Sequence, residues 1–306
     1  MNLPVIDDSI NNKRVLVRGD IDIPEGDFFR LEAIKPTIDF LLKNNNQVIL
    51  CGHIGRPNGK IVDGLSTKII SDWFKKEDSI ASLQNDKLIV LENLRFDPRE
   101  EANDESLAKE LATLADVYVN EAFAACEREH ASIVGVPKLL PHFAGFRLAK
   151  EVEVLSKVLE NPTRPLLVII GGAKIETKQP LIDKMKTFAD TVIVSEKIAS
   201  PVARNDINTD YFDKFSEIFI NAKTIIWNGP FGQIEDEEYQ AGTKRLVELI
   251  LENKEAYKIV GGGDTIGFLN KSGLTDKFNW VCTGGGSMLK FLSGEKLPGI
   301  QALMSS

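Results

Sequence analysis

Three glycine clusters carry the first chemical signal, because each stands where an apolar run gives way to polar residues. They are Gly171-Gly172 before Lys174, Gly261-Gly262-Gly263 before Asp264 and Thr265, and Gly284-Gly285-Gly286 before Ser287. Apolar runs that end in glycine and lead into helical patterns indicate buried parallel strands that feed helix starts. Backbone N–H groups in such turns can bind phosphate. With Lys174 and Asp264 beside them, the turns predict a site for a polyphosphate and its metal ion.

Basic residues in the first half of the chain follow the predicted strand ends in the same way. They are Arg18 and Arg30 around the first strand, His53 and Arg56 after the second, Arg95 after the third, and Arg128 and His130 after the fourth. Open parallel sheets bind ligands outside the carboxyl ends of their strands, and the planar fork of arginine suits phosphate and carboxylate. A single arginine is more often a solvated surface residue or an ion-pair partner. The repetition therefore carries the prediction, which is a pocket for a small anion with two charged ends.

Strands and helices that would position these residues alternate along the whole chain. The predicted strands cover residues 14–18, 47–51, 88–91 and 117–119 in the first half, and 166–170, 191–194, 224–227, 258–260 and 280–282 in the second. Helical patterns lie between them, such as Leu107, Leu111 and Leu114 after a predicted N-cap at Asp104. This alternation predicts an α/β fold with parallel sheets that helices cover on both faces.

The length of 306 residues suits two domains. Between the halves, Leu148, Val152, Leu155 and Leu159 recur at helical spacing, and the Asn-Pro pair at 161–162 would end that helix. We interpret this segment as a rigid connector between two lobes. An ordinary packed helix within one larger domain is the alternative.

Composition narrows the classes of function. A net charge of −8 argues against broad binding to nucleic acid or anionic membranes. Hydrophobic residues make up 43% of the chain, which allows a sizeable core. The cysteines Cys51, Cys126 and Cys282 are scattered without metal-ligand spacing, which fits a reducing compartment. The first residues lack the pattern of a signal peptide, and no apolar run reaches membrane-spanning length. We therefore expect a cytoplasmic protein.

Taken together, these segments resemble the phosphoglycerate kinase family. Matching stretches include Gly-His-Ile-Gly-Arg-Pro at 52–57, Leu-Glu-Asn-Leu-Arg-Phe at 91–96, Gly-Gly-Ala-Lys at 171–174 and Trp-Asn-Gly-Pro at 227–230. Further matches lie at 15–20, 115–123, 128–132, 261–264, 283–286 and 297–300, and all follow the order of the family.

The resemblance implies two three-layer (αβα) lobes of parallel sheet joined by a hinge helix. It assigns residues 1–146 to a lobe for 3-phosphoglycerate, 147–162 to the interlobe helix and 163–289 to a nucleotide-binding lobe, with 290–306 packing back on the first lobe. It also implies Mg²⁺ as the cofactor, ATP or ADP as the co-substrate, and closure of the hinge around the two ligands. A monomer without nucleic-acid or membrane partners is expected, although a shortened second lobe could leave a sheet edge for a dimer.

Site residues follow from the positions that match the motifs of the family. We call the residues that would bind 3-phosphoglycerate the basic set, although two of them are acidic. The set consists of Asp20, Asp22, Arg30, His53, Arg56, Arg95 and Arg128. The glycine set would bind the nucleotide and consists of Gly172, Lys174, Lys178, Asn228, Glu235, Gly262, Gly263, Asp264, Thr265, Gly284 and Gly285.

The resemblance gives catalytic roles to three of these residues and a metal to a fourth. Arg30 would steady the attacking carboxylate, Lys174 would neutralise the phosphoryl group in flight, and the amide of Gly285 would hold a phosphate oxygen. Asp264 would position the Mg²⁺. Simpler readings exist, because Lys178 and Glu235 could be solvated surface residues and Asp264 could cap a helix.

The chain departs from the family pattern between about residues 195 and 223. Ser195-Glu196-Lys197 stands where the family has a glycine-rich turn against the adenine ring. A helix, a strand and a further helix of the family are then reduced to a short segment at 198–205, which predicts a truncated second lobe and a shallower nucleoside site. Asp22 also stands where the family usually has an Asn, and its charge would repel an anionic substrate.

Three readings remain open from the sequence alone. The chain could be a compact, active phosphoglycerate kinase with weak base recognition, because phosphates supply most of the charge of a nucleotide. It could instead be a non-catalytic phosphoglycerate binder or regulatory paralogue with impaired nucleotide binding. It could also be a kinase that uses another small carboxylate or another phosphoryl donor.

Overall fold

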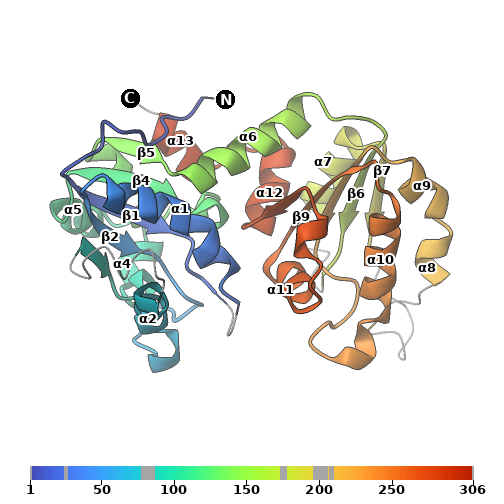
Figure 1. Cartoon of the computed structure of the whole chain (residues 1–306), viewed down its shortest axis with the longest axis horizontal. Coiled ribbons are helices and arrows are strands. Elements are labelled where there is room, and N and C mark those ends of the chain that lie inside the picture. The colour runs from blue at the N-terminus through green and yellow to red at the C-terminus, as the bar shows by residue number, and fades with distance from the viewer. Residues whose placement is uncertain are drawn as a thin grey trace. The chain divides into compact units, whose positions relative to one another are not determined.

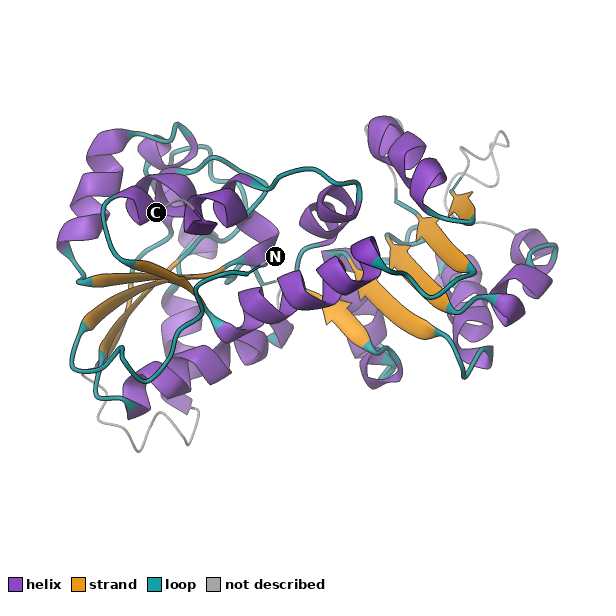
Figure 2. Cartoon of the chain, turned by 90° about the horizontal axis from the view of Figure 1, so that it is seen from above, coloured by secondary structure: helices purple, strands orange, loops and turns teal. Residues whose placement is uncertain are grey.

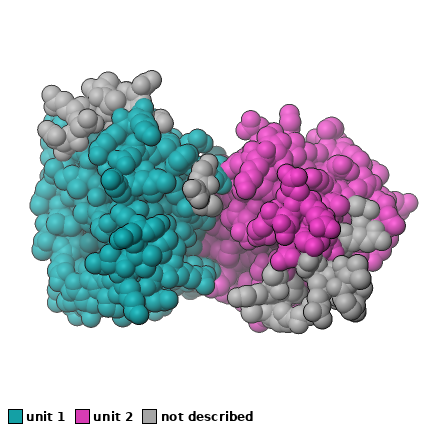
Figure 3. Space-filling model, turned by 90° about the horizontal axis from the view of Figure 1, so that it is seen from below, with its two compact units in different colours: residues 1–153, 296–306 teal, residues 154–295 magenta. Residues whose placement is uncertain are grey.

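The computed structural model describes residues 2–23, 27–76, 87–172, 178–195, 206 and 210–304. The chain divides into two compact units (Figure 3). Unit 1 comprises Met1–Glu153 and Lys296–Ser306, and unit 2 comprises Val154–Glu295. Strands and helices alternate in both units, which confirms the predicted α/β class (Figure 1). In the described part of the chain, none of the helices combines the length and apolar character that a membrane span needs.

Unit 1 is built on a five-stranded parallel sheet with the strand order β3-β2-β1-β4-β5. The strands are β1 (Arg14–Gly19), β2 (Gln47–Cys51), β3 (Leu88–Val90), β4 (Val117–Glu121) and β5 (His142–Ala144). The helices are α1 (Phe29–Lys43), α2 (Lys68–Lys76), α4 (Pro98–Glu101), α5 (Glu105–Thr113) and α13 (Pro298–Met304). Residues of β1, β2, β4, α1 and α2 form one apolar core. Because β2 and β4 flank β1, the strand order reverses beside β1, where open sheets bind ligands.

Unit 2 repeats this plan with the strand order β10-β9-β8-β6-β7, again all parallel. Its strands are β6 (Leu166–Ile170), β7 (Thr191–Val194), β8 (Thr224–Asn228), β9 (Tyr257–Gly261) and β10 (Trp280–Cys282). Its helices are α7 (Gln179–Phe188), α8 (Asp210–Asp213), α9 (Ser216–Asn221), α10 (Ala241–Glu252), α11 (Gly263–Lys271) and α12 (Gly285–Leu292). Figure 2 shows helices on both faces of the sheets. The order reverses between β6 and β8, whose carboxyl ends carry predicted site residues.

The C-terminal segment returns to unit 1. Helix α13 packs on the turn Ala131–Gly135 and on β5. The N–H of Gly299 donates to the carbonyl of Cys126 at 2.9 Å. A Cβ at Gly299 would lie 2.9 Å from the Cα of Cys126, so the close approach of the two backbones requires a glycine.

Helix α6 (Phe146–Glu160) is the segment that the sequence predicted between the halves, and it ends immediately before the Asn-Pro pair. The boundary between the two units falls inside it. Its first turn is held by the carboxylate of Glu121, the last residue of β4, which accepts from the N–H groups of Arg147 at 2.9 Å and Leu148 at 2.8 Å. The hydroxyl of Thr37 donates to the same carboxylate. The fold thus places a buried acid at the base of α6.

Strand predictions were right in position and differ from the structure mainly at their ends. Strands β4, β8 and β9 each run one or two residues further than predicted, up to Glu121, Asn228 and Gly261. The short strand β5 was not predicted. Its three residues are too few to show a period, and it forms by pairing with β4.

Burial predicts an unusual pH dependence for Glu121. Desolvation raises the pKa of this carboxyl to about 7, although the hydroxyl of Thr37 and the two backbone N–H groups oppose the shift. A raised folded-state pKa contributes stability that is present below the unfolded pKa and is lost as pH rises through the folded value. We expect the stability of Glu121→Gln relative to wild type to increase by about 3 kcal/mol from pH 4 to pH 8.

Urea unfolding at each pH measures this difference. Taking the difference from wild type cancels the contributions of the histidines, and the exposed residue Glu153 on α6 supplies the control Glu153→Gln. A pH-independent difference between Glu121→Gln and wild type would contradict the raised pKa.

Candidate active site

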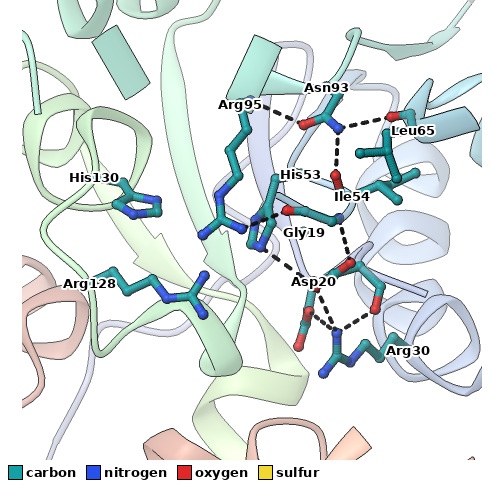
Figure 4. A network of polar contacts seen from close by, with 12 residues as sticks. Gly19, Asp20, Arg30, His53, Ile54, Leu65, Asn93, Arg95, Arg128 and His130 are labelled. Atoms are coloured by element: carbon teal, nitrogen blue, oxygen red, sulfur yellow. Dashed lines mark hydrogen bonds and ion pairs between the residues drawn. The ribbon is translucent and has the colours of Figure 1, made fainter. Parts of the chain in front are cut away.

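The basic set assembles at the carboxyl-terminal edge of the unit 1 sheet. Asp20 directly follows β1, His53 lies two residues after β2, and Arg95 lies in the turn Leu94–Phe96 after β3. Figure 4 shows the side chains of Arg30, Arg95 and Arg128 pointing toward the same space as His53 and Asp20. The structure therefore brings these residues together as predicted from their placement after strands. Arg56 follows Gly55 in the loop after β2, and its side chain is exposed.

Arg30 and Asp20 form a partly buried ion pair. Nη1 of Arg30 lies 3.3 Å from Oδ1 of Asp20 and 4.0 Å from Oδ2 of Asp22, and it also donates to the carbonyl of Asp22. Burial raises the pKa of Asp20, and the charge of Arg30 opposes that shift. Oδ2 of Asp20 is buried without a hydrogen-bond partner among the described residues. That oxygen is positioned to accept a hydrogen bond from a hydroxyl group of a ligand.

The loop after β2 is fastened on two sides. Nδ2 of Asn93 donates to the carbonyls of Ile54 at 2.7 Å and Leu65 at 2.9 Å. Oδ1 of Asp22 accepts from the N–H of Gly55 at 2.8 Å, and Nη1 of Arg95 donates to the carbonyl of Gly55 at 2.7 Å. Because Asp22 and Arg95 both hold this loop, two members of the basic set also have a structural role.

Histidines of this region are uncharged at neutral pH. Burial, followed by the charges of Arg18, Arg95 and Arg128, lowers the pKa of His53 well below its usual range. Burial and the same arginines lower the pKa of His130 to about 3. Nδ1 of His130 lies 3.7 Å from Oε1 of the fully buried Glu100. The positive charge of the pocket therefore comes from its arginines.

The glycine set assembles in unit 2 where β6, β8, β9 and β10 end. The N–H of Gly171 donates to the carbonyl of Asn228 at 2.8 Å, and Nζ of Lys178 donates to the carbonyl of Gly171 at 2.8 Å. The N–H of Gly229 donates to Oγ1 of Thr265 at 3.1 Å. These contacts join the ends of β6 and β8 to the start of α11, on the edge where the strand order reverses.

Close packing at this edge leaves no room for a side chain at Gly285. A Cβ at Gly285 would lie 2.6 Å from the backbone N of Gly262 and would also collide with Nδ2 of Asn228. Gly262 adopts a φ of 105°, which side-chain-bearing residues rarely adopt. Nδ2 of Asn228 is buried without a hydrogen-bond partner among the described residues. Helices α11 and α12 begin at Gly263 and Gly285 without a side-chain cap.

Hydrogen-bond donors thus converge at this edge. The first turn of each helix presents backbone N–H groups that have no partner within the helix, and the amide of Asn228 adds a side-chain donor. Donors at two helix starts suit an anion such as a phosphate group. The glycine clusters at 261–263 and 284–286 thus lie at helix starts, as expected, and their binding of a polyphosphate stays a prediction.

Charged members of the glycine set differ in position. Burial lowers the pKa of Lys178, and the charge of Asp264 opposes that shift. Asp264 is exposed in the first turn of α11, and Glu235 is exposed in the loop before the turn Glu237–Tyr239. Lys174 lies outside the described residues, as do Glu196 and Lys197 of the substituted turn.

The residues present fit a metal ion that arrives with a polyphosphate. Within the described ranges there is no group of three or more His, Cys, Asp or Glu side chains that could hold a metal by itself. Mg²⁺ usually keeps several waters and binds one or two carboxylates plus the phosphates of its substrate. The single exposed carboxylate of Asp264 at a helix start suits that mode of binding.

Sequence reasoning missed the residues behind the site. Arg18 and His130 were noted after strands but were not assigned to the site, and Glu100 was not noted. Arg18 carried a signal, because it is a charged residue within the apolar strand β1, and the structure buries it completely. Glu100 carried none, because it lies in a run of charged residues typical of an exposed helix.

Comparison with known proteins points to one family. The family model described as phosphoglycerate kinase matches residues 5–205 and 195–295. The phosphoglycerate kinase of Dictyoglomus turgidum is 34% identical over 387 residues, with 98% of each chain covered. That of Finegoldia magna is 33% identical over 393 residues, with 99% of each chain covered. The solved structure of phosphoglycerate kinase from Coxiella burnetii is 28% identical and has a TM-score of 0.78, with 96% of this chain and 97% of that chain covered.

Both alignments are longer than the 306 residues of this chain, so the relatives contain segments that it lacks. The two stretches that the family model matches meet at residues 195–205. The family pattern is therefore interrupted in unit 2, after β7.

The packing of the glycine set predicts opposite effects for two glycine-to-alanine changes. We expect Gly285→Ala to destabilise unit 2 by about 1–3 kcal/mol, because the added methyl group must displace backbone. Gly263→Ala should leave the stability unchanged or slightly raised, because a Cβ there meets no atom within 4 Å. Urea unfolding of both variants measures the difference. Equal stabilities for the two variants would contradict the close approach of β8, β9 and α12.

Proposed function

The chain belongs to the phosphoglycerate kinase family, and from that membership we propose that it transfers a phosphoryl group between ATP and 3-phosphoglycerate. The products are ADP and 1,3-bisphosphoglycerate, and the reverse reaction makes ATP in glycolysis. The observation that carries the proposal for this chain lies in unit 1, where several arginines point toward the same space as Asp20, whose buried Oδ2 has no hydrogen-bond partner among the described residues. This combination suits a small molecule with two anionic ends and a hydroxyl group between them.

On the acceptor side, each group of 3-phosphoglycerate has a matching side chain. The arginines Arg56, Arg95 and Arg128 would bind the phosphate, with His53 as a further donor. Oδ2 of Asp20 would accept from the hydroxyl group. Arg30, which is held by Asp20 at 3.3 Å, would orient the carboxylate that attacks the phosphorus.

On the donor side, the glycine set would bind ATP by its phosphates. The starts of α11 and α12, the amide of Asn228 and the ammonium of Lys178 are the donors, and Lys174 would add a second ammonium. Asp264 would hold the Mg²⁺ that accompanies the nucleotide, and this ion neutralises charge on the phosphate oxygens. Glu235 would contact the ribose.

In this reaction the residues mainly position the reactants and stabilise negative charge. An oxygen of the substrate carboxylate forms a bond to the γ-phosphorus, and the bond from that phosphorus to the bridging β–γ oxygen breaks, so ADP leaves. No general base is needed, because the carboxylate is ionised at neutral pH. Lys174 and the amide of Gly285 would stabilise charge on the transferred group.

The proposal also covers the ligands, the oligomeric state and the compartment of the protein. The ligands are small molecules, the chain acts as a monomer, and its setting is cytoplasmic. All three cysteines are buried and none forms a disulfide, which fits a reducing compartment.

Removal of Lys174 tests the reaction. We expect Lys174→Ala to lower kcat for ATP formation from 1,3-bisphosphoglycerate and MgADP by about a hundred- to a thousandfold, with binding of 3-phosphoglycerate retained. The exposed Lys184, which pairs with Glu295 at 2.9 Å, supplies the control Lys184→Ala. Calorimetric titration of wild type with MgADP completes the test. A folded protein that binds 3-phosphoglycerate but no ADP at millimolar concentration would show the proposed transfer to be wrong.

Asp22 offers a test of the acceptor site. Its carboxylate lies 3.9 Å from Nε2 of His53 and 4.0 Å from Nη1 of Arg30, so it competes with an anionic substrate for these donors. We expect Asp22→Asn to tighten binding of 3-phosphoglycerate by about three- to tenfold, because the amide oxygen still accepts from Gly55 but carries no charge. Calorimetry measures the dissociation constant, and weaker binding by the variant would refute competition.

A further inference from the structure

Arg18 is buried at the end of β1 and is held on three sides. Its Nε donates to Oγ of Ser132 at 2.9 Å, and Nη1 donates to the carbonyl of Gly19. Its Nη2 lies 2.8 Å from Nδ1 of His53. The side chain is fully buried, and among its hydrogen-bond partners here His53 is the member of the basic set.

The contact with Arg18 fixes the proton of His53. A guanidinium has five N–H donors and no acceptor, so Nδ1 of His53 must accept with its lone pair. A neutral imidazole carries one N–H, which must therefore be on Nε2. A doubly protonated ring would turn an N–H of His53 against an N–H of Arg18 inside a buried site.

We propose that Arg18 is a positioning residue that holds His53 as the neutral Nε2–H tautomer, so that His53 offers a bound anion a hydrogen-bond donor and no charge. The identity of that anion as 3-phosphoglycerate rests on the proposed function, whereas the state of the ring does not.

Groups around His53 agree with this assignment. Oδ2 of Asp22 is 3.9 Å from Nε2, and this aspartate is the anion that faces the ring. Arg95, Arg128 and His130 approach from the loops after β3 and β4 (Figure 4). Burial lowers the pKa of His53, and Arg18 is the largest of the charges that lower it further.

A second layer of hydrogen bonds orients Arg18. Ser132, whose Oγ accepts from Arg18, donates that hydroxyl to Oε1 of Glu100 at 2.5 Å. The N–H of Ser132 donates to Oε2 of Glu100 at 2.9 Å. Glu100 is fully buried on α4, so its charge balances the buried guanidinium through one serine. The direction of every hydrogen bond from Glu100 to His53 is thereby set.

The consequence for binding is independence from pH. A histidine at its ordinary pKa of about 6.5 gains or loses a charge near neutral pH, and the affinity for an anion would change with it. His53 as a fixed donor keeps the same hydrogen bond over that range.

Nitrogen NMR on the ligand-free protein tests the tautomer directly. The chain has three histidines, so a long-range ¹H–¹⁵N spectrum contains few signals, which His53→Gln and His142→Gln assign. Between pH 5.5 and 8, we expect His53 to show an unprotonated Nδ1 and a protonated Nε2 throughout. A protonated Nδ1, or a ring that titrates near its ordinary pKa, overturns the proposal.

Substitution of Arg18 tests its role. In Arg18→Met we expect the pKa of His53 to rise, so that its ring titrates between pH 5.5 and 8 in the NMR spectra. The dissociation constant for 3-phosphoglycerate, relative to wild type at the same pH, should fall about tenfold as the pH is lowered through that range. The ratio of the two dissociation constants at each pH cancels the effect of the ligand's own titration, because both proteins bind the same ligand. Arg18→Lys should restore a donor to Nδ1, so the ratio of the dissociation constants should again be independent of pH. Arg14→Met, on the exposed part of β1, is the control.

Folding and function are kept separate in this test. The double variant Arg18→Met/Glu100→Gln avoids an unpaired buried carboxylate if the single variant unfolds. A constant ratio in a folded Arg18→Met variant refutes the role of Arg18. If wild type shows the expected tautomer but binds no 3-phosphoglycerate, the proposed function fails and the assignment of His53 stands.

Discussion

Mutual repulsion of the arginines is the constraint on which unit 1 depends. Guanidinium groups that point into one pocket repel each other before any ligand arrives, and burial strengthens that repulsion. Each of these groups has a carboxylate partner that offsets part of its charge. Arg30 pairs with Asp20 at 3.3 Å, Arg95 with Glu101 at 3.0 Å and Arg128 with Glu127 at 3.8 Å. Arg18 reaches Glu100 through Ser132. The histidines stay neutral, so they add donors without adding to the repulsion.

Unit 2 would bind an anion in another way under the proposed function, because most of its described donors are backbone groups. Its described donors are backbone N–H groups at two helix starts, the amide of Asn228 and the ammonium of Lys178, and glycines let β8, β9 and α12 approach closely. Such a site needs little charge compensation, since peptide dipoles carry no net charge. It also depends on backbone shape, because a methyl group at Gly285 would collide with Gly262 and Asn228.

The sequence predicted much of the fold because its signals were local. Apolar runs ending in glycine located β6, β9 and β10, and the recurrence of basic residues after strands located side chains that the fold brings together. What it could not show depends on contacts between distant segments. Arg18 meets Ser132 across 114 positions, and Glu100 meets Ser132 across 32, so neither partnership is visible in spacing. Strand β5 was not predicted for a related reason, because its three residues form a strand by pairing with β4.

The return of helix α13 to unit 1 has a consequence for biosynthesis. A ribosome makes residues 1–153 first, yet the segment from Lys296 onward that completes this unit emerges only after all of unit 2. Nascent domains generally fold as their residues become available, N-terminal first. Here the turn at Cys126 gains its contact with Gly299 only after unit 2 has been synthesised. A polypeptide released too early would lack this closing contact, which gives cellular proteases a way to tell truncated chains from finished ones.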